Sequence, residues 1–307
     1  RWNDPFNPFG RCDFKKMKVL SIDVGNTNVN YGIVEAGSVT GLGSFTTKNL
    51  KDAPDSLAHF HELLEDAKID GVAFCSVVPN LNDTLRALLE LTKKPLFQLT
   101  HETDCGLNLN YPNPSEIGHD RIANAIFAQA NYPVPAIIID LGTAITFDIV
   151  TENGYEGGVI APGLRLMTRY LNEQTALLPE LSDEALVPTQ GAFGTSTIHA
   201  MQLGVSVGFS GMVEALLKHI TQSILSTRES PSKSCSTKTS LEDATTLENQ
   251  SPQGYEANLG HFTILSTGGS TANLTQDWMG KTHFIPHLTL MGLAIAYERF
   301  AKDRSML

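Results

Sequence analysis

The feature that most constrains the fold is a strand-turn-strand pattern that occurs twice. Ile137-Ile138-Ile139-Asp140-Leu141-Gly142-Thr143 repeats the frame of Leu20-Ser21-Ile22-Asp23-Val24-Gly25-Asn26. In both copies an apolar strand ends in Asp-x-Gly, a polar turn follows, and a second strand closes in Ile33-Val34 or Ile149-Val150. A frame shared by the heads of the two halves of the chain indicates a duplicated domain.

Apolar runs and helical periods alternate along the rest of the chain, which indicates mixed sheets with helical crossovers. In the first half we expect strands at Lys18–Val24, Val29–Val34, Gly71–Val78 and Pro95–Leu99, a further strand after Gly37, and helices at Pro54–Lys68 and Leu81–Leu91. In the second half we expect a Gly-rich hairpin, a long helix from Thr195 to about Ile224, a strand at Phe262–Ser266 and a final helix near His287–Phe300. The 307 residues suffice for two cores, so we predict an α/β protein with two domains, 17–133 and 134–307, after an extension at 1–16.

A Ser/Thr/Glu-rich tract interrupts the second predicted domain. From about 226 to 259 the sequence has few large apolar residues and no helical or strand period. Such a composition buries too little apolar surface to offset the entropy that is lost on ordering. We therefore predict a mobile, solvated surface insertion there.

Composition argues against several classes of partner. The formal net charge of -11 disfavours general nucleic-acid binding, which needs a basic surface. The most apolar run, Val134–Phe147, is interrupted by Asp140 and falls short of the roughly 20 residues of a membrane span. The four cysteines show no CxxC spacing, so reduced thiols are expected. We expect a cytoplasmic protein without nucleic-acid or membrane partners.

The first Asp-x-Gly turn has the residues needed to hold a phosphate. Gly25 lets the backbone approach closely, Asn26 and Thr27 can donate hydrogen bonds, and Asp23 can hold Mg²⁺ through water. Taken alone, this motif is explained more simply as an ordinary hairpin turn. The second copy, Asp140-Leu141-Gly142-Thr143, favours phosphate binding over a plain hairpin turn, because two such turns across a cleft would bind both ends of a polyphosphate. Actin/hexokinase-like kinases hold ATP in this way.

Two other nucleotide-binding motifs are not supported. The chain contains no G-x-G-x-x-G, so a dinucleotide-binding start is not indicated. Gly280-Lys281-Thr282 resembles the end of a P-loop, but Thr275 stands where the first glycine is required. We interpret that segment as a turn.

A proline-rich loop leads through Asp120 and Arg121 into a predicted helix at Ile122–Asn131. The plain interpretation is an N-cap aspartate beside a surface arginine. The functional interpretation makes Asp120 the general base that accepts the proton of a substrate hydroxyl, while the fork of Arg121 binds a substrate carboxylate. Both interpretations fit the residues alone.

Five motifs occur together in an order typical of one enzyme family. They are Asp23-x-Gly25-Asn26-Thr27, Gly118-x-Asp120-Arg121, Asp140-x-Gly142-Thr143-Ala144-x-Thr146, Gly157-Gly158-x-Ile160-x-Pro162-Gly163 and Thr267-Gly268-Gly269. With this set the chain resembles type III pantothenate kinases from Met17 to about Phe300, apart from the insertion. The resemblance implies ATP-dependent phosphorylation of pantothenate to 4′-phosphopantothenate, the first step of coenzyme A biosynthesis.

The same resemblance implies a fold, an assembly and a set of site residues. It implies two ribonuclease-H-like domains of the actin-like ATPase class and a homodimer whose pantothenate pocket lies near the subunit interface. Asp120 would be the catalytic base, Asp23 would bind Mg²⁺ with ATP, and Asp140 would bind an activating K⁺ or NH₄⁺. Pantothenate would contact Tyr111, Gly118, His119, Asp120, Arg121 and Thr197. ATP would contact Asp23, Gly25, Asn26, Thr27, Asn30, Gly142, Thr143, Gly268 and Gly269, although many relatives carry Lys at the position of Asn30.

Two other functions stay open on the sequence. A kinase for another small hydroxyl or acid substrate would share the fold, but the segment 118–121 disfavours it, and activity with glucose or acetate would reveal it. A non-catalytic regulatory protein that kept the fold is the second alternative. The presence of Asp23, Asp120 and Asp140 together argues for catalysis.

Overall fold

The computed structural model describes residues 17–52, 68–182, 185–186, 189–229, 259–269 and 282–305. The predicted extension at 1–16 and all but the last residue of the predicted helix Pro54–Lys68 lie outside these residues. The predicted insertion begins inside a helix, because α6 (Thr197–Glu229) runs on to Glu229, and 230–258 lie outside the description. The other predicted strands and helices are present, with ends shifted by a few residues.

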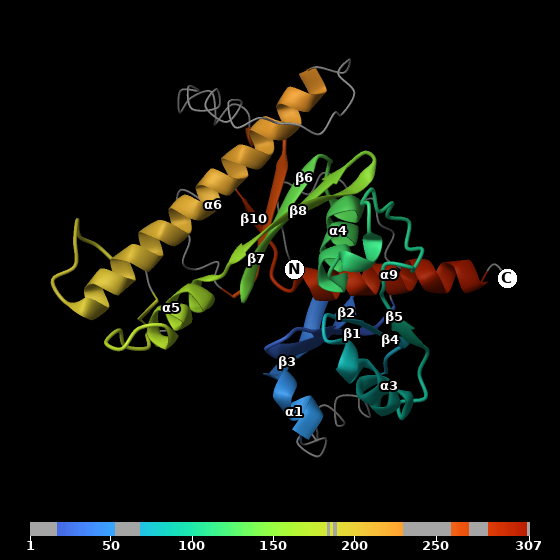
Figure 1. Ribbon diagram of the computed structural model, residues 1–307. Coiled ribbons are helices and arrows are strands. Elements are labelled where there is room, and N and C mark those ends of the chain that lie inside the picture. The colour runs from blue at the N-terminus through green and yellow to red at the C-terminus, as the bar shows by residue number, and fades with distance from the viewer. Residues whose placement is uncertain are drawn as a thin grey trace.

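Two five-stranded sheets share one topology (Figure 1). The first has the order β3-β2-β1-β4-β5, and the second has the corresponding order β8-β7-β6-β9-β10. In each sheet the central strand pairs antiparallel with a hairpin partner and parallel with a strand that follows a crossover. The predicted duplication is therefore present in the fold. The strands are β1 (Val19–Val24), β2 (Asn28–Glu35), β3 (Ser38–Thr46), β4 (Gly71–Ser76), β5 (Leu96–Gln98), β6 (Ala136–Leu141), β7 (Ala144–Thr151), β8 (Gly154–Pro162), β9 (Thr263–Thr267) and β10 (His283–Phe284).

The central strands β1 and β6 are buried in the same pattern. Every residue is buried except the penultimate one, which is Asp23 in β1 and Asp140 in β6 and retains some exposure. The parallel neighbours end beside them, with Cys75 of β4 opposite Asp23 and Thr267 of β9 opposite Asp140. Ligands of open α/β sheets bind beyond the carboxyl ends of parallel strands. Each sheet therefore presents one carboxylate at the edge where sheets of this kind bind ligands.

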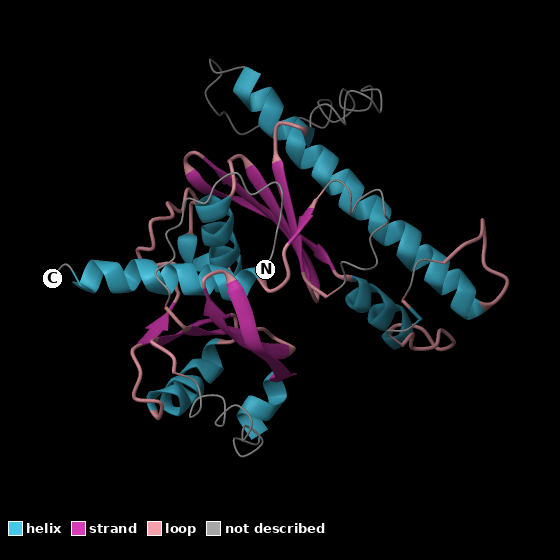
Figure 2. Cartoon of the chain, turned by 180° about the vertical axis from the view of Figure 1, so that it is seen from behind, coloured by secondary structure: helices cyan, strands magenta, loops and turns pink. Residues whose placement is uncertain are grey.

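Two helices lie between the sheets, as Figure 1 and Figure 2 show from opposite sides. The helix α4 (His119–Asn131) packs mainly on β6, β7 and β8 of the second sheet and also contacts β4 of the first, and α9 (Leu288–Ser305) packs on β1, β2 and β4 of the first. The helices also pack on each other, and a Cβ on Gly292 would meet the carbonyl oxygen of Ala123. A residue without a side chain is needed at this crossing. Each helix thus covers the sheet of the other half of the chain.

The outer faces of the sheets are covered by separate helices. In the first sheet α1 (Thr47–Asp52) and α3 (Asn82–Glu90) supply apolar side chains to the face opposite α9. In the second, α5 (Leu164–Glu173) and α6 cover the face opposite α4. The buried stripe of α6 repeats every four residues, as one face of a helix requires, through Met201, Val205, Phe209, Val213 and Leu217. Short 3₁₀ turns lie at Pro79–Leu81 and Pro114–Glu116.

The helix α6 is apolar on more than its buried face. Val207 is 68% exposed and Ile198 is 48% exposed. Among the described residues, α6 is the one helix long and apolar enough to cross a membrane, with a mean hydropathy of 1.4 and 33% of the apolar window buried inside the chain. The sequence-based expectation that no segment approaches such a span does not hold for α6. The buried stripe places one face of α6 in the core against the second sheet.

Candidate active site

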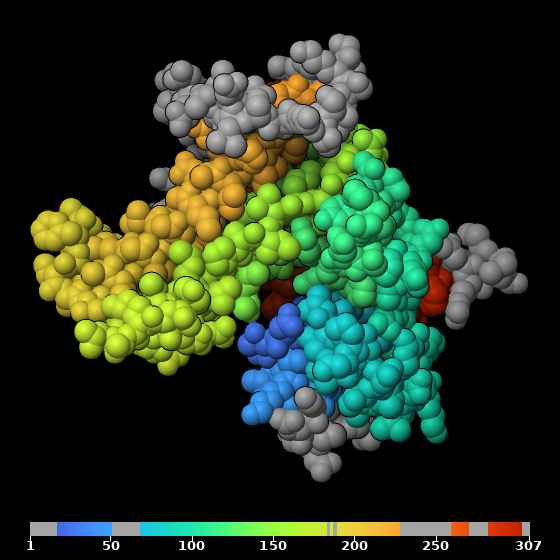
Figure 3. All heavy atoms as spheres, viewed as in Figure 1, coloured from blue at the N-terminus to red at the C-terminus, as the bar shows by residue number. Residues whose placement is uncertain are grey.

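The two Asp-x-Gly turns meet between the sheets. The first turn consists of 25–27, between β1 and β2, and the second consists of 142–143, between β6 and β7. Thr27 Oγ1 lies 3.4 Å from Thr143 Oγ1. The Gly25 amide closes the first turn by donating to Asn28 O at 2.9 Å. Figure 3 shows a hollow in the surface between the blue part of the first sheet and the yellow-green part of the second.

Three carboxylates lie around these turns, on Asp23, Asp120 and Asp140. Burial raises the pKa of Asp23 to about 7, and repulsion from Asp120 and Asp140 adds to the rise. Burial likewise raises the pKa of Asp140 to about 6, with a further contribution from Asp120. Like charges that repel in a buried site favour the binding of a cation.

Asp23 is held by its neighbours in the first sheet. The Cys75 thiol donates to Asp23 Oδ1 at 3.5 Å. Asn30 lies opposite Asp23 on β2, and its hydrogen bond to the carboxylate works against the effect of burial on the Asp23 pKa. Ser44 Oγ in turn donates to Asn30 Oδ1 at 2.9 Å. Asn30 therefore orients Asp23, a role that the sequence did not indicate.

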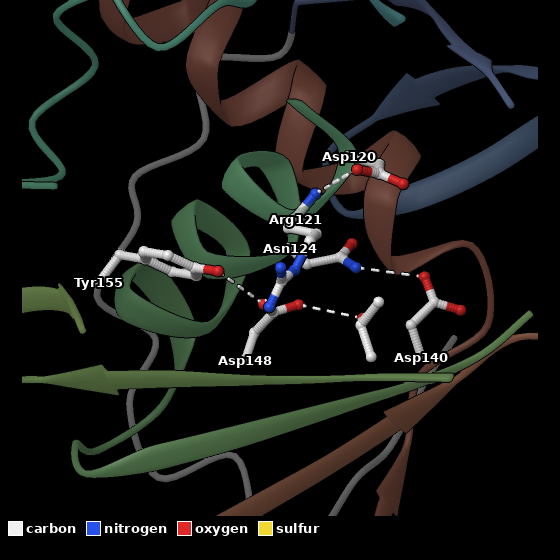
Figure 4. A network of polar contacts seen from close by, with 7 residues as sticks. Asp120, Arg121, Asn124, Asp140, Asp148 and Tyr155 are labelled. Atoms are coloured by element: carbon white, nitrogen blue, oxygen red, sulfur yellow. Dashed lines mark hydrogen bonds and ion pairs between the residues drawn. The ribbon is translucent and has the colours of Figure 1, made fainter. Parts of the chain in front are cut away.

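Asp140 is held by a chain of polar contacts from the two central helices, and Figure 4 shows the contact from Asn124 of α4. Asn124 Nδ2 of α4 donates to Asp140 Oδ2 at 3.3 Å, and Thr289 Oγ1 of α9 donates to Asn124 Oδ1 at 2.8 Å. Asn124 is buried. A buried amide needs partners at both its oxygen and its nitrogen. Through these two hydrogen bonds Asn124 links α4 and α9 to Asp140, next to the second turn.

Asp120 stands in the first turn of α4, which begins at His119. The predicted capping role is only partly present, since Gly118 is the N-cap residue and Asp120 Oδ1 accepts the Arg121 amide at 2.8 Å. Burial raises the pKa of Asp120, and the Arg121 amide and charge oppose the rise. Gly118 leaves room for the carboxylate, because a Cβ there would lie 2.5 Å from Asp120 Oδ1. A raised pKa makes this carboxylate a stronger base.

His119 joins the start of α4 to the end of β4. Its Nδ1 lies 3.1 Å from Ser76 O, and a protonated Nδ1 donates to that carbonyl. Its ring stacks on His101, with 6.1 Å between the centroids. Burial lowers the pKa of His119, so the neutral ring is favoured. His119 therefore fixes the segment that carries Asp120 against the first sheet.

Arg121 is bound by a carboxylate of the second sheet (Figure 4). Its Nε donates to Asp148 Oδ1 at 2.7 Å, and Asp148 also accepts Tyr155 OH at 3.0 Å and Thr146 Oγ1 at 3.2 Å. Burial raises the pKa of Asp148 to about 7, against the Arg121 charge and the Tyr155 hydrogen bond. Three donors on one carboxylate stabilise its ionised form.

Tyr111 lies beside this network, whereas Thr197 does not. The Tyr111 ring packs near Tyr155 with 6.2 Å between centroids, and a Cβ on Gly157 would lie 3.2 Å from Tyr111 Cε2. Thr197 begins α6 and lines a groove between α5 and α6. Figure 1 shows this end of α6 well away from α4. Within one chain, the structure therefore brings Tyr111 but not Thr197 to the Arg121 network.

The segment Thr267-Gly268-Gly269 continues β9 next to the second turn. Thr267 pairs with Asp140, and Gly268 has a φ of 98°, in the region that favours glycine. A Cβ on Gly268 would lie 2.7 Å from Leu141 N. The segment thus passes closely over the end of β6, on the second-sheet side of the two turns.

Sequence comparison assigns the chain to a family. The sequence model of type III pantothenate kinases matches residues 19–219. A type III pantothenate kinase from Roseiflexus sp. is 32% identical over 288 residues, which are 91% of this chain and 98% of that protein. This chain belongs to the type III pantothenate kinase family. Another type III pantothenate kinase, from Dehalococcoides mccartyi, is 36% identical over 211 residues, which are 66% of this chain and 79% of that protein.

The fold agrees with membership of the type III pantothenate kinase family. A Campylobacter jejuni protein assigned to a Baf family of transcriptional activators has a crystal structure that matches with a TM-score of 0.51 and 17% identity, over 94% of this chain and 100% of that chain. At this identity the likeness concerns the fold alone. Two mixed sheets of one topology confirm the predicted class, the paired ribonuclease-H-like domains of the actin-like ATPases.

The predicted cation ligands of this type III pantothenate kinase come from different turns. The described part of the chain contains no group of three or more His, Cys, Asp or Glu side chains that could hold a metal ion. Asp23 and Asp140 each offer a carboxylate without a protein cage around it. A cation at either residue would have to complete its shell with water or with phosphate oxygens, which is how Mg²⁺ is held in phosphoryl-transfer enzymes.

Sequence motifs missed four polar residues that support the site: Asn124, Asp148, Tyr155 and Thr289. Asp148 had a readable signal, because it is a lone carboxylate inside the apolar run Ile145–Val150, and such a group cannot be buried without partners. The others had none, since their partners lie far away along the chain or on a neighbouring strand.

Proposed function

We propose that this chain transfers the γ-phosphoryl group of ATP to the hydroxyl of pantothenate and forms 4′-phosphopantothenate, the first step of coenzyme A biosynthesis. Membership of the family supports this activity. The observation that carries it is the position of Asp120 and Arg121, side by side at the start of α4, next to carboxylates from both turns. Pantothenate has a hydroxyl at one end and a carboxylate at the other. Asp120 can act as the base for the hydroxyl, and the guanidinium of Arg121 can bind the carboxylate.

In this mechanism Asp120 accepts the proton of the pantothenate hydroxyl as the bond to phosphorus forms. Its carboxylate has a pKa raised by burial, which suits a base that must be ionised and still hold a proton. Arg121 binds the pantothenate carboxylate and sets the direction of the hydroxyl. Phosphoryl transfer has a loose transition state, so positioning by these two residues and by the turn amides supplies much of the rate.

The same proposal includes Mg²⁺ with ATP at Asp23 and a monovalent cation, K⁺ or NH₄⁺, at Asp140. Burial and the charge of Asp120 raise the pKa of both Asp23 and Asp140, which fits a site completed by cations. When bound, these cations would neutralise charge on the phosphate oxygens. Asn30 and Cys75 orient Asp23 toward such a ligand, and Asn124 orients Asp140.

We also propose that the enzyme is a cytoplasmic homodimer. The groove between α5 and α6, about 890 Å³, is lined almost entirely by apolar side chains and includes Thr197. Near it, Leu177 is 90% exposed, Phe193 is 76% exposed and Tyr170 is 62% exposed. Exposed apolar surface of this kind marks an interface. A second copy seated there would cover it and would bring its own Thr197 toward the neighbouring pantothenate site.

The test is phosphopantothenate formation by the purified protein with Mg-ATP. We expect activity with pantothenate and none with glucose or acetate, and we expect K⁺ or NH₄⁺ to raise the rate well above that in Na⁺. Activity with glucose or acetate alone would replace the proposed substrate. An equal rate with K⁺, NH₄⁺ and Na⁺ would contradict the proposed role of Asp140 as the ligand of an activating cation. A molecular mass from light scattering equal to that of a monomer would contradict the proposed homodimer.

A further inference from the structure

Asp148 belongs to none of the roles assigned above, and its position is unusual for a carboxylate. Side chains alternate along β7, so Ile145, Phe147 and Ile149 enter the apolar core beneath α6, while Thr146 and Asp148 face α4. Asp148 has no exposed surface. Burying a carboxylate is unfavourable unless partners compensate for the lost water, and an apolar residue would pack there at less cost.

Arg121 carries the positive charge that compensates the buried carboxylate of Asp148, but not every nitrogen of its guanidinium has a hydrogen-bond partner. Among the described residues, only Nε of the guanidinium bonds to Asp148. Nη2 is buried against Gly158, where a Cβ would meet it, and it has no hydrogen-bond partner within those residues. A buried cationic donor without an acceptor is costly. Nη2 therefore lacks an acceptor among the described residues.

The competing partner for Arg121 is Asp120, its neighbour in sequence. Asp120 Oδ1 accepts the Arg121 backbone amide, and in the described structure the guanidinium pairs with Asp148 and not with Asp120. A direct pair between these side chains would lower the pKa of Asp120 and weaken it as a base. It would also occupy the nitrogens that a substrate carboxylate needs.

We propose that Asp148 is a positioning residue for the phosphorylation of pantothenate, an inference that rests on the proposed function. Held by Tyr155 and Thr146, it fixes the guanidinium of Arg121 so that the terminal nitrogens serve the substrate carboxylate and stay away from Asp120. Asp148 acts only through Arg121. It thereby sets the affinity of the site for acceptors that carry a carboxylate.

The main test is the steady-state kinetics of Asp148→Asn. We expect KM for pantothenate to rise about 10- to 100-fold, because the charge-assisted bond that orients Arg121 is lost, while KM for ATP stays within about threefold of the wild-type value. The acid limb of the kcat profile should move to lower pH, because Arg121 is free to pair with Asp120. A purely structural role would change both KM values together. That outcome, or an unchanged KM for pantothenate, would overturn the proposal.

Milder variants keep the test decisive even where Asp148→Asn does not fold. Tyr155→Phe and Thr146→Val preserve shape and each remove one donor to Asp148. Each should raise KM for pantothenate about 2- to 10-fold, in the same direction as the larger change. Glu35→Gln is the matched control, since it removes a half-exposed carboxylate that pairs with Lys18, and both KM values should stay unchanged. Wild-type kinetics in both mild variants would also overturn the proposal.

A double-mutant cycle separates this proposal from the proposed function. If Asp148 acts through Arg121, then Asp148→Asn should change KM for pantothenate far less in the Arg121→Lys background than in the wild type. Independent, additive effects would contradict the proposal while leaving pantothenate as the substrate. A wild-type protein without pantothenate kinase activity would instead contradict the proposed function.

Discussion

Replacement of Asp120 by Asn should remove most of the activity and make the fold more stable at the same time. Asn keeps the shape of the side chain, and its Oδ1 can still accept the Arg121 amide that lies at 2.8 Å. It cannot accept a proton from pantothenate. Loss of a general base lowers a rate by about 100- to 10,000-fold, which corresponds to about 3 to 5 kcal/mol of activation free energy.

The gain in stability follows from the charges. Burial first, and then Asp120, raise the folded-state pKa of Asp23 to about 7 and of Asp140 to about 6, above the ordinary value of 3.8. A carboxyl whose folded pKa is raised destabilises the fold fully above that pKa, and the effect is gone below the unfolded value. Removing the Asp120 charge should therefore add on the order of 1 kcal/mol above pH 7. For a chain of this size that is a rise in Tm of about 2 °C, which should vanish near pH 4.

The assay pairs phosphopantothenate formation with melting curves at pH 8 and pH 4. Glu116→Gln is the matched control, because it removes the same charge from an exposed position in the preceding loop, where its partner is Asn113 at 3.2 Å. Its activity and Tm should equal those of the wild type. Activity of Asp120→Asn within tenfold of the wild type would refute the role of Asp120 as base. A lower Tm of Asp120→Asn at pH 8 would contradict the proposed repulsion of Asp23 and Asp140 by Asp120.

Two further substitutions test the contacts of the central helices. Thr289→Val removes the donor to Asn124 and should lower the free energy of unfolding by about 1 kcal/mol in urea titrations, and an unchanged midpoint would contradict the contact. Gly292→Ala forces a methyl group against Ala123 O and should cost about 1 to 3 kcal/mol. Gly211→Ala on α6, where a Cβ meets nothing within 4 Å, should instead gain up to about 1 kcal/mol, and similar losses in both variants would refute the steric argument.

The central strands and turns could be predicted because their signal is local. A run such as Ile137-Ile138-Ile139 is fully buried in the sheet, and the Asp-x-Gly that follows each run marks its end. The second copy of the Asp-x-Gly frame supports the interpretation of the first as the end of a strand. The apolar period predicts that α4 begins at Ile122, but the helix begins at His119, because Gly118 supplies the N-cap and the polar first turn carries no period.

The packing partners of the helices could not be predicted from the sequence. The apolar period of α9 indicates that one face is buried, but it does not say which sheet covers it. It lies in the second half of the chain, yet it packs on β1, β2 and β4 of the first sheet. The same limit hid Asn124, whose partner Thr289 is 165 positions away. Long-range partners of this kind are set by topology, which periodicity does not encode.

The packing of α9 on the first sheet also sets the order in which the chain can complete its fold during synthesis. β1 ends at Val24 and α9 begins at Leu288, so the ribosome must add the 263 residues 25–287 between them. At roughly 5 to 20 residues per second this takes about 13 to 50 s. During that interval Val19 and Ala73, which share a core with α9 in the finished fold, lack its cover. The core of the first sheet is therefore complete only after a late helix has docked on an early sheet.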